Sequence, residues 1–328
     1  MLFYTIRRFF YMIVILLMLS VISFVIIQLP PGDYLTTYVA ELQVRGQRVS
    51  EAKIASLKKQ YGLDLPLYLR YFQWMWKMLQ GDFGKSFSWN KPVIKLIAER
   101  LPLTLMISIL SFVFIYIVAI PIGIYSATHQ YSIGDYTFTV IGFTGLAIPN
   151  FLFALILMFL FYKYFGLGVG GLFSTQYMDA AWSLSKFIDM LKHLPIPIIV
   201  IGTAGTAGLI RIMRGCLLDE LGKQYVITAR AKGVSERTLL FKYPVRVAVN
   251  PIISTVGWML PVIVSGETIT AIVLNLPTTG PLLFNALRSQ DMYLAGSTVM
   301  FLSFLTVIGT FISDVLLVVI DPRIRYEK

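Results

Sequence analysis

The sequence predicts an all-α protein that is embedded in a membrane and crosses it six times. Of its 328 residues, 57% are hydrophobic and only 14% are charged, whereas soluble domains carry about 25% charged residues. The mean hydropathy is +0.74. Long uncharged runs recur along the chain, and most approach the ~20 residues that a spanning helix requires. This composition favours a polytopic membrane protein over a soluble domain.

Six apolar segments define the expected spans. The first is longer than the roughly 7–15 apolar residues of a signal peptide, so we interpret it as a retained helix. The fourth ends at Arg211, whose side chain can reach the membrane interface. Pro149 and Pro277 are expected to bend or end helices, because proline lacks a backbone donor. The expected spans are Phe9–Gly32, Leu103–Thr128, Tyr136–Tyr162, Leu194–Ile210, Val247–Gly266 and Met292–Ser313.

Basic residues predict the orientation, because cytoplasmic loops are enriched in Lys and Arg. With the N-terminus in the cytoplasm, that side holds Arg7 and Arg8, eight basic residues in 211–246 and three in the tail, against four in the short outer loops. Both termini are therefore expected in the cytoplasm. The organisation is a cytoplasmic N-terminus with the first span (1–32), an extracytoplasmic loop domain (33–100), a core of five spans (101–320) with a cytoplasmic loop at 211–246, and a cytoplasmic tail (321–328).

The outer loop at 33–100 contains two helical patterns. Ser50 is a suitable N-cap for a helix that continues through Tyr61, with Gly62 as its stop. The second pattern, Pro66–Leu79, is rich in aromatic residues. An aromatic stripe of this kind is typical of a packing face or an interfacial belt, and we prefer that interpretation to direct ligand contact.

The segment 211–246 lies outside the membrane because each Lys or Arg costs roughly 2.5–3.5 kcal/mol at the centre of a span. Leu217–Lys232 is expected to be helical, with Gly233 as its C-terminal stop. Ser235 is then the N-cap of a second helix that continues through Tyr243. From these residues alone, the segment is either an ordinary basic loop or a helix–glycine–helix surface that another protein approaches closely.

Short motifs recur in order along nearly the whole chain, and in the basic segment TARAKG (228–233) is followed by SER (235–237). This segment is similar to the loop by which the dipeptide/oligopeptide/nickel permeases of ATP-driven (ABC) importers dock onto their ATPases. Of that family's general Glu-Ala-Ala pattern, only Ala229 is present. The other motifs, in order, are IRR (6–8), PGD (31–33), YGLDLP (61–66), QGDFGKSF (80–87), ERLPLTL (99–105), IPNF (148–151), NPI (250–252), SG (265–266), NLP (275–277) and DPRIR (321–325).

The resemblance implies a type I importer permease in a prokaryotic plasma (inner) membrane, and specifically the first of two permease subunits. Its implied partners are a second, similar permease that forms a heterodimer with it, two cytoplasmic ATPases that bind ATP and Mg²⁺, an extracytoplasmic solute-binding protein and membrane lipid. No nucleic-acid partner is expected. This chain would itself bind no cofactor and would contain no catalytic residue. The residues implied to couple to the ATPases are Thr228, Ala229, Arg230, Ala231, Lys232, Gly233, Ser235 and Arg237.

Residues within the expected spans suggest a pathway and a packing surface. An acidic residue inside a membrane is a functional candidate, so Glu267 either lines the pathway or pairs with a cation of the partner subunit. We assign Gly266, Asn150 and Pro149 to the same pathway or gate. Asp314 is expected to make a structural hydrogen bond. Small residues permit close helix contacts, so Gly202, Gly205 and Gly208 are expected to pack against a helix, with the partner permease as one candidate.

Alternative functions remain open at this point. An ion-coupled secondary transporter would show internal repeats around a charged midplane site, and an intramembrane enzyme would need a nucleophile–base pair or a metal site. The single cysteine, Cys216, and two distant histidines form no metal-ligand pattern. Within the importer interpretation, di- or oligopeptides are the first choice of solute, with oligosaccharides and nickel as alternatives.

Overall fold

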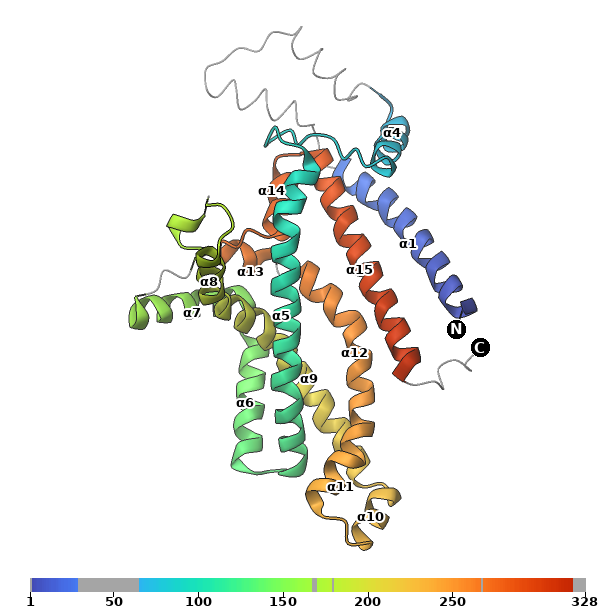
Figure 1. Cartoon of the computed structure of the whole chain (residues 1–328), viewed down its shortest axis with the longest axis vertical. Coiled ribbons are helices and arrows are strands. Elements are labelled where there is room, and N and C mark those ends of the chain that lie inside the picture. The colour runs from blue at the N-terminus through green and yellow to red at the C-terminus, as the bar shows by residue number, and fades with distance from the viewer. Residues whose placement is uncertain (1, 29–64, 167–169, 179, 267, 321–328) are drawn as a thin grey trace. The chain divides into compact units, whose positions relative to one another are not determined.

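The computed structural model describes residues 2–28, 65–166, 170–178, 180–266 and 268–320. Their secondary structure is helical apart from an isolated β-bridge between Lys85 and Pro92. The helices are α1 (Leu2–Gln28), α4 (Leu67–Leu79), α5 (Val93–Thr128), α6 (Ile133–Ala147), α7 (Asn150–Phe165), the 3₁₀ turn η1 (Thr175–Tyr177), α8 (Leu184–His193), α9 (Pro195–Leu221), α10 (Gln224–Ala231), α11 (Glu236–Lys242), α12 (Pro244–Gly266), α13 (Thr268–Val273), α14 (Thr279–Arg288) and α15 (Met292–Ile320) (Figure 1).

Among the described residues, four helices are long and apolar enough to cross a membrane. Stretches of α1, α5, α9 and α15 meet this test, and α6 with α7 would form a fifth span if the bent pair crosses once. The expected fifth span corresponds to α12, which covers Pro244–Gly266. These helices agree with a polytopic all-α protein, while the count of six spans stays a prediction.

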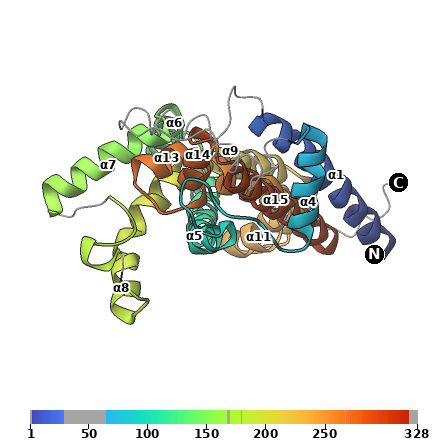
Figure 2. The ribbon, with the colours of Figure 1, turned by 90° about the horizontal axis from the view of Figure 1, so that it is seen from above.

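The expected third span is wrong as a single helix. It consists of α6 and α7, which are bent by 108° relative to each other. Ile148 has an extended backbone (φ −84°, ψ 123°), as expected for a residue that the following proline excludes from the helical region. Pro149 then precedes the first turn of α7. Seen from above, α7 extends away from the end of α6 (Figure 2).

The chain divides into two compact units, and α5 and α15 contribute residues to both. The larger unit comprises Thr104–Pro277 and the residues from Ile308 onward. Within it, α6, α7 and α12 all pack against α9. Val200, Leu209 and Met213 of α9 are fully buried. This central position explains why α9 carries small and apolar residues on most of its faces.

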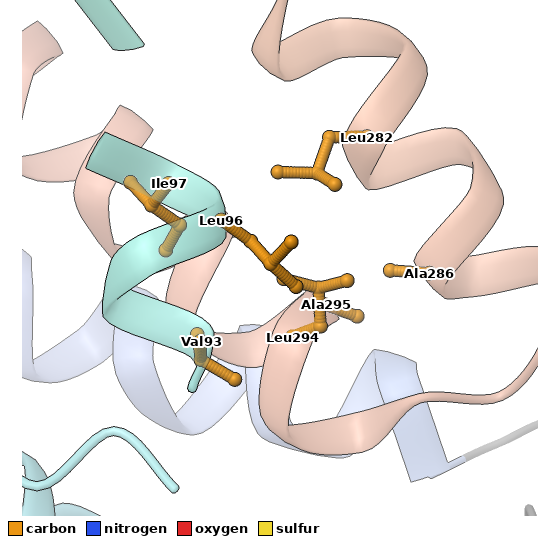
Figure 3. Close-up of a cluster of buried hydrophobic side chains, with 7 residues drawn as sticks. All are labelled: Val93, Leu96, Ile97, Leu282, Ala286, Leu294 and Ala295. Atoms are coloured by element: carbon orange, nitrogen blue, oxygen red, sulfur yellow. The ribbon is translucent and has the colours of Figure 1, made fainter. Parts of the chain in front are cut away.

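The smaller unit comprises Leu2–Leu103 and Thr278–Val307. One hydrophobic cluster joins the first turns of α5 to α14 and the start of α15 (Figure 3). Its buried residues are Val93, Leu96, Ile97, Leu282, Ala286, Leu294 and Ala295. A second cluster places Trp74 of α4 against Phe24 of α1. The aromatic helix expected at Pro66–Leu79 is therefore confirmed as α4, and Trp74 makes it partly a packing element.

A buried carboxylate fixes the loop that precedes α5 within the smaller unit. Asp291 lies just before α15 and is fully buried. Its carboxylate accepts hydrogen bonds from the Ser86 hydroxyl at 2.6 Å and the Ser88 backbone N–H at 3.1 Å. It also accepts from the Leu294 backbone N–H at 3.2 Å, which caps the helix. Burial raises the pKa of Asp291, although these donors oppose the shift.

A second polar cluster organises the segment before α9 in the larger unit. Asp189 of α8 accepts hydrogen bonds from the Ser174 hydroxyl at 2.6 Å and the Ser174 N–H at 2.7 Å. Lys186 is buried and donates to the carbonyl of Ala180 at 2.6 Å. Its ammonium group also lies 4.8 Å from the ring centre of Phe173. The segment is thus folded by its own polar contacts.

Two expected helices differ from, or fall outside, the described structure. The helix expected at Leu217–Lys232 is wrong as a continuous element, because α9 extends past Ile210 to Leu221 and ends at Gly222 before α10 starts. Glycine weakens a helix interior and is a common end point. The helix expected from Ser50 to Tyr61 lies outside the described residues.

Candidate functional site

The candidate site is the connection between α9 and α12, formed by residues 222–243. We call this segment the elbow. It contains α10 and α11, joined by a short turn, and Figure 1 shows both at the end of α9 and α12. Helix α10 begins after Gly222 and Lys223, and α12 begins at Pro244, directly after the C-cap residue Tyr243 of α11.

Gly233 produces the turn between α10 and α11. Its φ of +75° lies in the left-handed region, where a residue with a Cβ is strained. The Gly233 N–H donates to the carbonyl of Arg230 at 3.0 Å, and the Val234 N–H donates to that of Ala229 at 3.4 Å. The expected stop at Gly233 is therefore confirmed. Ser235 occupies the N-cap position of α11, but its hydroxyl donates to Thr238 Oγ1 at 2.9 Å instead of capping the helix.

A small hydrophobic cluster holds the two short helices together. Val226 and Ala229 of α10 are buried against Leu239 of α11. Val234 and Tyr243 complete the cluster from its edges. Ala229, one of the expected docking residues, therefore faces the other helix of the elbow. Its small side chain allows α10 and α11 to approach each other.

The remaining residues of the expected docking set form an exposed surface. Gly233 is exposed, and a Cβ built on it would meet no atom within 4 Å. The chain thus leaves open space beside the turn. The exposed members of the set are Thr228, Arg230, Ala231, Lys232, Gly233, Ser235 and Arg237.

An exposed ion pair connects the two ends of the turn. Arg230 Nε donates to Glu236 Oε1 at 2.7 Å, and its Nη2 donates to Oε2 at 3.2 Å. Hydrogen bonds from Arg230 hold the pKa of Glu236 below its usual value. At the start of α10, Tyr225 donates to Glu220 at 2.5 Å, and burial together with that carboxylate raises the pKa of Tyr225 to about 12. The elbow therefore keeps its shape through local polar contacts as well as its apolar cluster.

Rigid helices connect the elbow to the apolar part of the larger unit. Helix α9 continues without interruption from Pro195 to Leu221, a length of about 40 Å at 1.5 Å per residue. On the other side, α11 packs against α12. The elbow is therefore directly connected to α9 and packed against α12.

An ion pair that the sequence analysis missed ties α9 to the start of α6. Arg214 Nη2 donates to Asp135 Oδ2 at 3.0 Å, and the Asp135 side chain is 5% exposed. Asp135 also accepts the backbone N–H of Tyr131 at 3.1 Å. Ser132 caps the helix through the Asp135 N–H. The Ser-x-x-Asp spacing at 132–135 signals a helix start, but the sequence does not reveal the distant arginine.

The structure does not bring the expected pathway residues into one described site. Glu267 lies outside the described residues, and the surroundings of Gly266 and of the Asp314 side chain are likewise not described. Pro149 and Asn150 lie at the 108° bend between α6 and α7. Their assignment to a pathway therefore stays a prediction.

The three glycines of α9 have different surroundings. A Cβ on Gly202 would lie 2.5 Å from Phe114, and a Cβ on Gly205 would lie 2.7 Å from Ile115. Both glycines thus allow α5 of the same chain to approach α9. A Cβ on Gly208 would meet nothing within 4 Å. The close contacts at Gly202 and Gly205 are made within this chain.

Comparison with known proteins identifies a family for the chain. Residues 119–326 match the binding-protein-dependent transport system inner membrane components. Residues 1–109 match the N-terminal segment of binding-protein-dependent transport system membrane components. Together these matches span both units of the structure.

Relatives that align with nearly the whole chain are also named as permeases. The chain is 36% identical to the oligopeptide transport system permease protein AppB of Bacillus subtilis (strain 168), over 98% of this chain and 99% of the relative. It is 31% identical to a putative peptide permease protein of Brucella ovis, over 99% of each. It is 28% identical to the dipeptide transport system permease protein DppB of Escherichia coli (strain K12), over 94% and 95%. The chain therefore belongs to the binding-protein-dependent transport system inner membrane components, the permeases of ABC importers, and has their type I fold.

Proposed function

We propose that this chain is one permease subunit of an ATP-driven, binding-protein-dependent importer of di- or oligopeptides. The carrying observation is the elbow, whose exposed face leaves open space at Gly233 and which lies between α9 and α12. Relatives that share 28–36% of its residues over nearly the whole chain are named for oligopeptides and dipeptides. These names support peptides over the alternative solutes.

The working complex contains this chain, a second permease subunit, two ATPases and an extracytoplasmic solute-binding protein. ATP and Mg²⁺ bind to the ATPases, and this chain contributes transport without a catalytic group. The protein is a multi-pass inner-membrane protein. The excess of basic residues in 211–246 supports a cytoplasmic elbow, with both termini on the same side.

Coupling begins when ATP binding closes the ATPase pair. The exposed face around Thr228, Gly233 and Arg237 rests in a groove of one ATPase and moves with it. The buried contacts among Val226, Ala229 and Leu239 make α10 and α11 move together. Because α9 is continuous and α11 packs on α12, the displacement reaches the membrane helices. The solute pathway is then open alternately to each side.

The bend between α6 and α7 is the proposed gate element within the described residues. Helix interruptions at membrane depth are tolerated where the backbone is buried in protein or lines a cavity. Pro149 and Asn150 lie at such an interruption. We retain them, with Gly266 and Glu267, as pathway residues of the importer.

The test is ATP hydrolysis by the complex reconstituted in lipid vesicles with its binding protein. Short peptides, oligosaccharides and Ni²⁺ are supplied in parallel, and uptake is measured with and without an ion gradient. Peptide-stimulated hydrolysis and ATP-dependent peptide uptake are expected. Stimulation by an oligosaccharide or Ni²⁺ alone would reassign the solute. Uptake that follows the ion gradient without ATP would contradict the importer mechanism.

A further inference from the structure

A cavity between α6 and α9 has no role in the coupling mechanism above. Its volume is about 230 Å³. Apolar and small residues form most of its wall, including Phe138, Gly142 and Leu146 of α6 and Ala207 of α9. Arg211 and Arg214 of α9 also line it. The cavity therefore combines an apolar wall with cationic groups contributed by one helix.

The two arginines differ in how much positive charge they leave for a ligand. Arg214 is paired with Asp135 at 3.0 Å, so that pair is close to neutral. Its Nε atom is nevertheless buried and has no hydrogen-bond partner among the described residues. A buried donor of this kind usually has a partner. Because this atom has almost no accessible surface, a ligand in the cavity does not reach it, and Arg214 leaves no free donor there.

Arg211 supplies the uncompensated charge. Its side chain is exposed and forms no ion pair with the described carboxylates. Its guanidinium group lies 4.9 Å from the centre of the Phe143 ring, a geometry typical of a cation–π contact. The net charge beside the cavity is therefore positive, despite Asp135.

We propose that this cavity binds an anionic phospholipid. The phosphate accepts hydrogen bonds from the Arg211 guanidinium, while the first part of an acyl chain lies against Phe138, Gly142 and Leu146. The proposal rests on the cytoplasmic placement of the elbow, which puts this end of α9 at the inner leaflet. Anionic lipids and basic pockets between helices meet at that leaflet. A free phosphate ion would leave the apolar wall without a ligand.

The location predicts a link to transport. A lipid in the cavity contacts both α6 and α9, and α9 leads directly to the elbow. Filling the cavity would therefore stabilise the contact between these helices in one state of the transport cycle. Anionic lipid acts on the complex at a site separate from the solute pathway and from the ATPases.

The test is native mass spectrometry of the complete, delipidated complex titrated with phosphatidylglycerol or phosphatidylcholine of the same chain length. Wild type is expected to bind phosphatidylglycerol about fivefold more tightly than phosphatidylcholine, the effect of one uncompensated basic residue. Arg211→Gln should weaken phosphatidylglycerol binding by about fivefold, the effect of one basic residue near an anionic surface. Lys223→Gln is the matched control, since Lys223 is exposed and lies outside the cavity.

A second variant tests the apolar wall. A Cβ on Gly142 would lie 3.6 Å from the Ala207 Cβ, an ordinary contact, and both residues line the cavity, so Gly142→Leu adds side-chain volume at its wall. It is expected to weaken phosphatidylglycerol binding while the complex still assembles. Displacement of the lipid by millimolar inorganic phosphate would instead indicate a free-anion site and overturn the proposal.

Equal binding of both lipids, or equal losses in Arg211→Gln and Lys223→Gln, would also overturn it. If Gly142→Leu bound phosphatidylglycerol as tightly as wild type, the cavity would be excluded as the lipid-binding site. Lipid binding is measured without solute or ATP, so its failure is distinguishable from a failure of the importer mechanism, which the hydrolysis assay reports. Binding with the expected selectivity in a complex that does not use ATP would retain the lipid site and reject the proposed transport mechanism.

Discussion

Substitution of Gly233 separates backbone strain from obstruction of the proposed docking surface. With φ at +75° and no atom within 4 Å of the position that a Cβ would occupy, Gly233→Ala creates no clash. Its cost is the left-handed conformation, about 1–2 kcal/mol. Gly233→Asn should cost less, because Asn adopts this region more readily. Gly233→Trp has a similar backbone cost but adds a large side chain on the exposed face.

Gly81 provides a matched control for this series. Its φ is +81°, and a Cβ there would also meet nothing within 4 Å. It lies in the loop 33–100, which the charge distribution predicts to be outside the cell. Gly81→Trp therefore imposes the same kind of strain and the same side chain at a position remote from the proposed ATPase contact.

The assay is copurification of the ATPases with the permease, followed by binding-protein-stimulated ATP hydrolysis. Gly233→Ala and Gly233→Asn should retain the ATPases, with at most a few-fold loss of coupled hydrolysis. Gly233→Trp should lose copurification, while Gly81→Trp should retain it. Normal copurification and transport by Gly233→Trp would show that the elbow is not the docking surface. Equal losses at Gly81 and Gly233 would attribute the effect to strain.

Three further predictions concern stability and pH. Leu96 is 1% exposed and Ile94 is 43% exposed, so Leu96→Ala should lower the free energy of unfolding by about 2–5 kcal/mol; denaturant unfolding in detergent should show a much smaller effect for Ile94→Ala, and equal effects would contradict the assigned core. Burial by itself would raise the pKa of Asp189, but the Ser174 hydrogen bonds and the charges of His193 and Lys192 hold it below its usual value. The stabilisation from Asp189 is then present above its ordinary pKa of about 3.9 and is lost as the pH falls through its lower folded pKa. Melting curves of wild type and Asp189→Asn should therefore differ at neutral pH and converge below about pH 4, whereas a pH-independent difference would refute the ionic contribution. Arg214→Gln removes the cation beside the buried Asp135 and should cost about 1–3 kcal/mol, because the Arg214 side chain is 34% exposed and Asp135 keeps the Tyr131 N–H. Arg214→Lys should cost less because it retains the charge; thermal melting that ranks the two variants in the opposite order would contradict this account.

Several turns and helices could be predicted from the sequence because they depend on residues that are adjacent in the chain. Gly233 is followed by a potential cap, Ser235, which predicted the turn and the start of α11. Pro149 predicted the interruption after α6. The aromatic run at Pro66–Leu79 predicted α4. The family motifs around the elbow were also readable, since they lie within a few residues of one another.

Helix boundaries were less predictable where the backbone preference of one residue opposes the helical or apolar character of the residues around it. Hydropathy placed a single span over Tyr136–Tyr162, but the preference of Ile148 for an extended backbone before proline produced two helices with a 108° bend. Apolar content measures whether a segment prefers lipid, and it does not specify the direction of its axis. Similarly, Gly222 ended α9 within a region that helix propensity favoured as continuous.

The sequence by itself determined the all-α membrane character, the presence of a basic segment between two apolar helices and the helix–glycine–helix pattern, because hydropathy, charge and backbone freedom are properties of the residues themselves. Only the tertiary structure decided that Ala229 is buried against Leu239, that Gly202 admits Phe114, and that Arg214 meets Asp135. The arginine and the aspartate are separated by 79 positions in the sequence. Their contact depends on how α6 packs on α9, and packing between distant helices is not encoded in any local pattern.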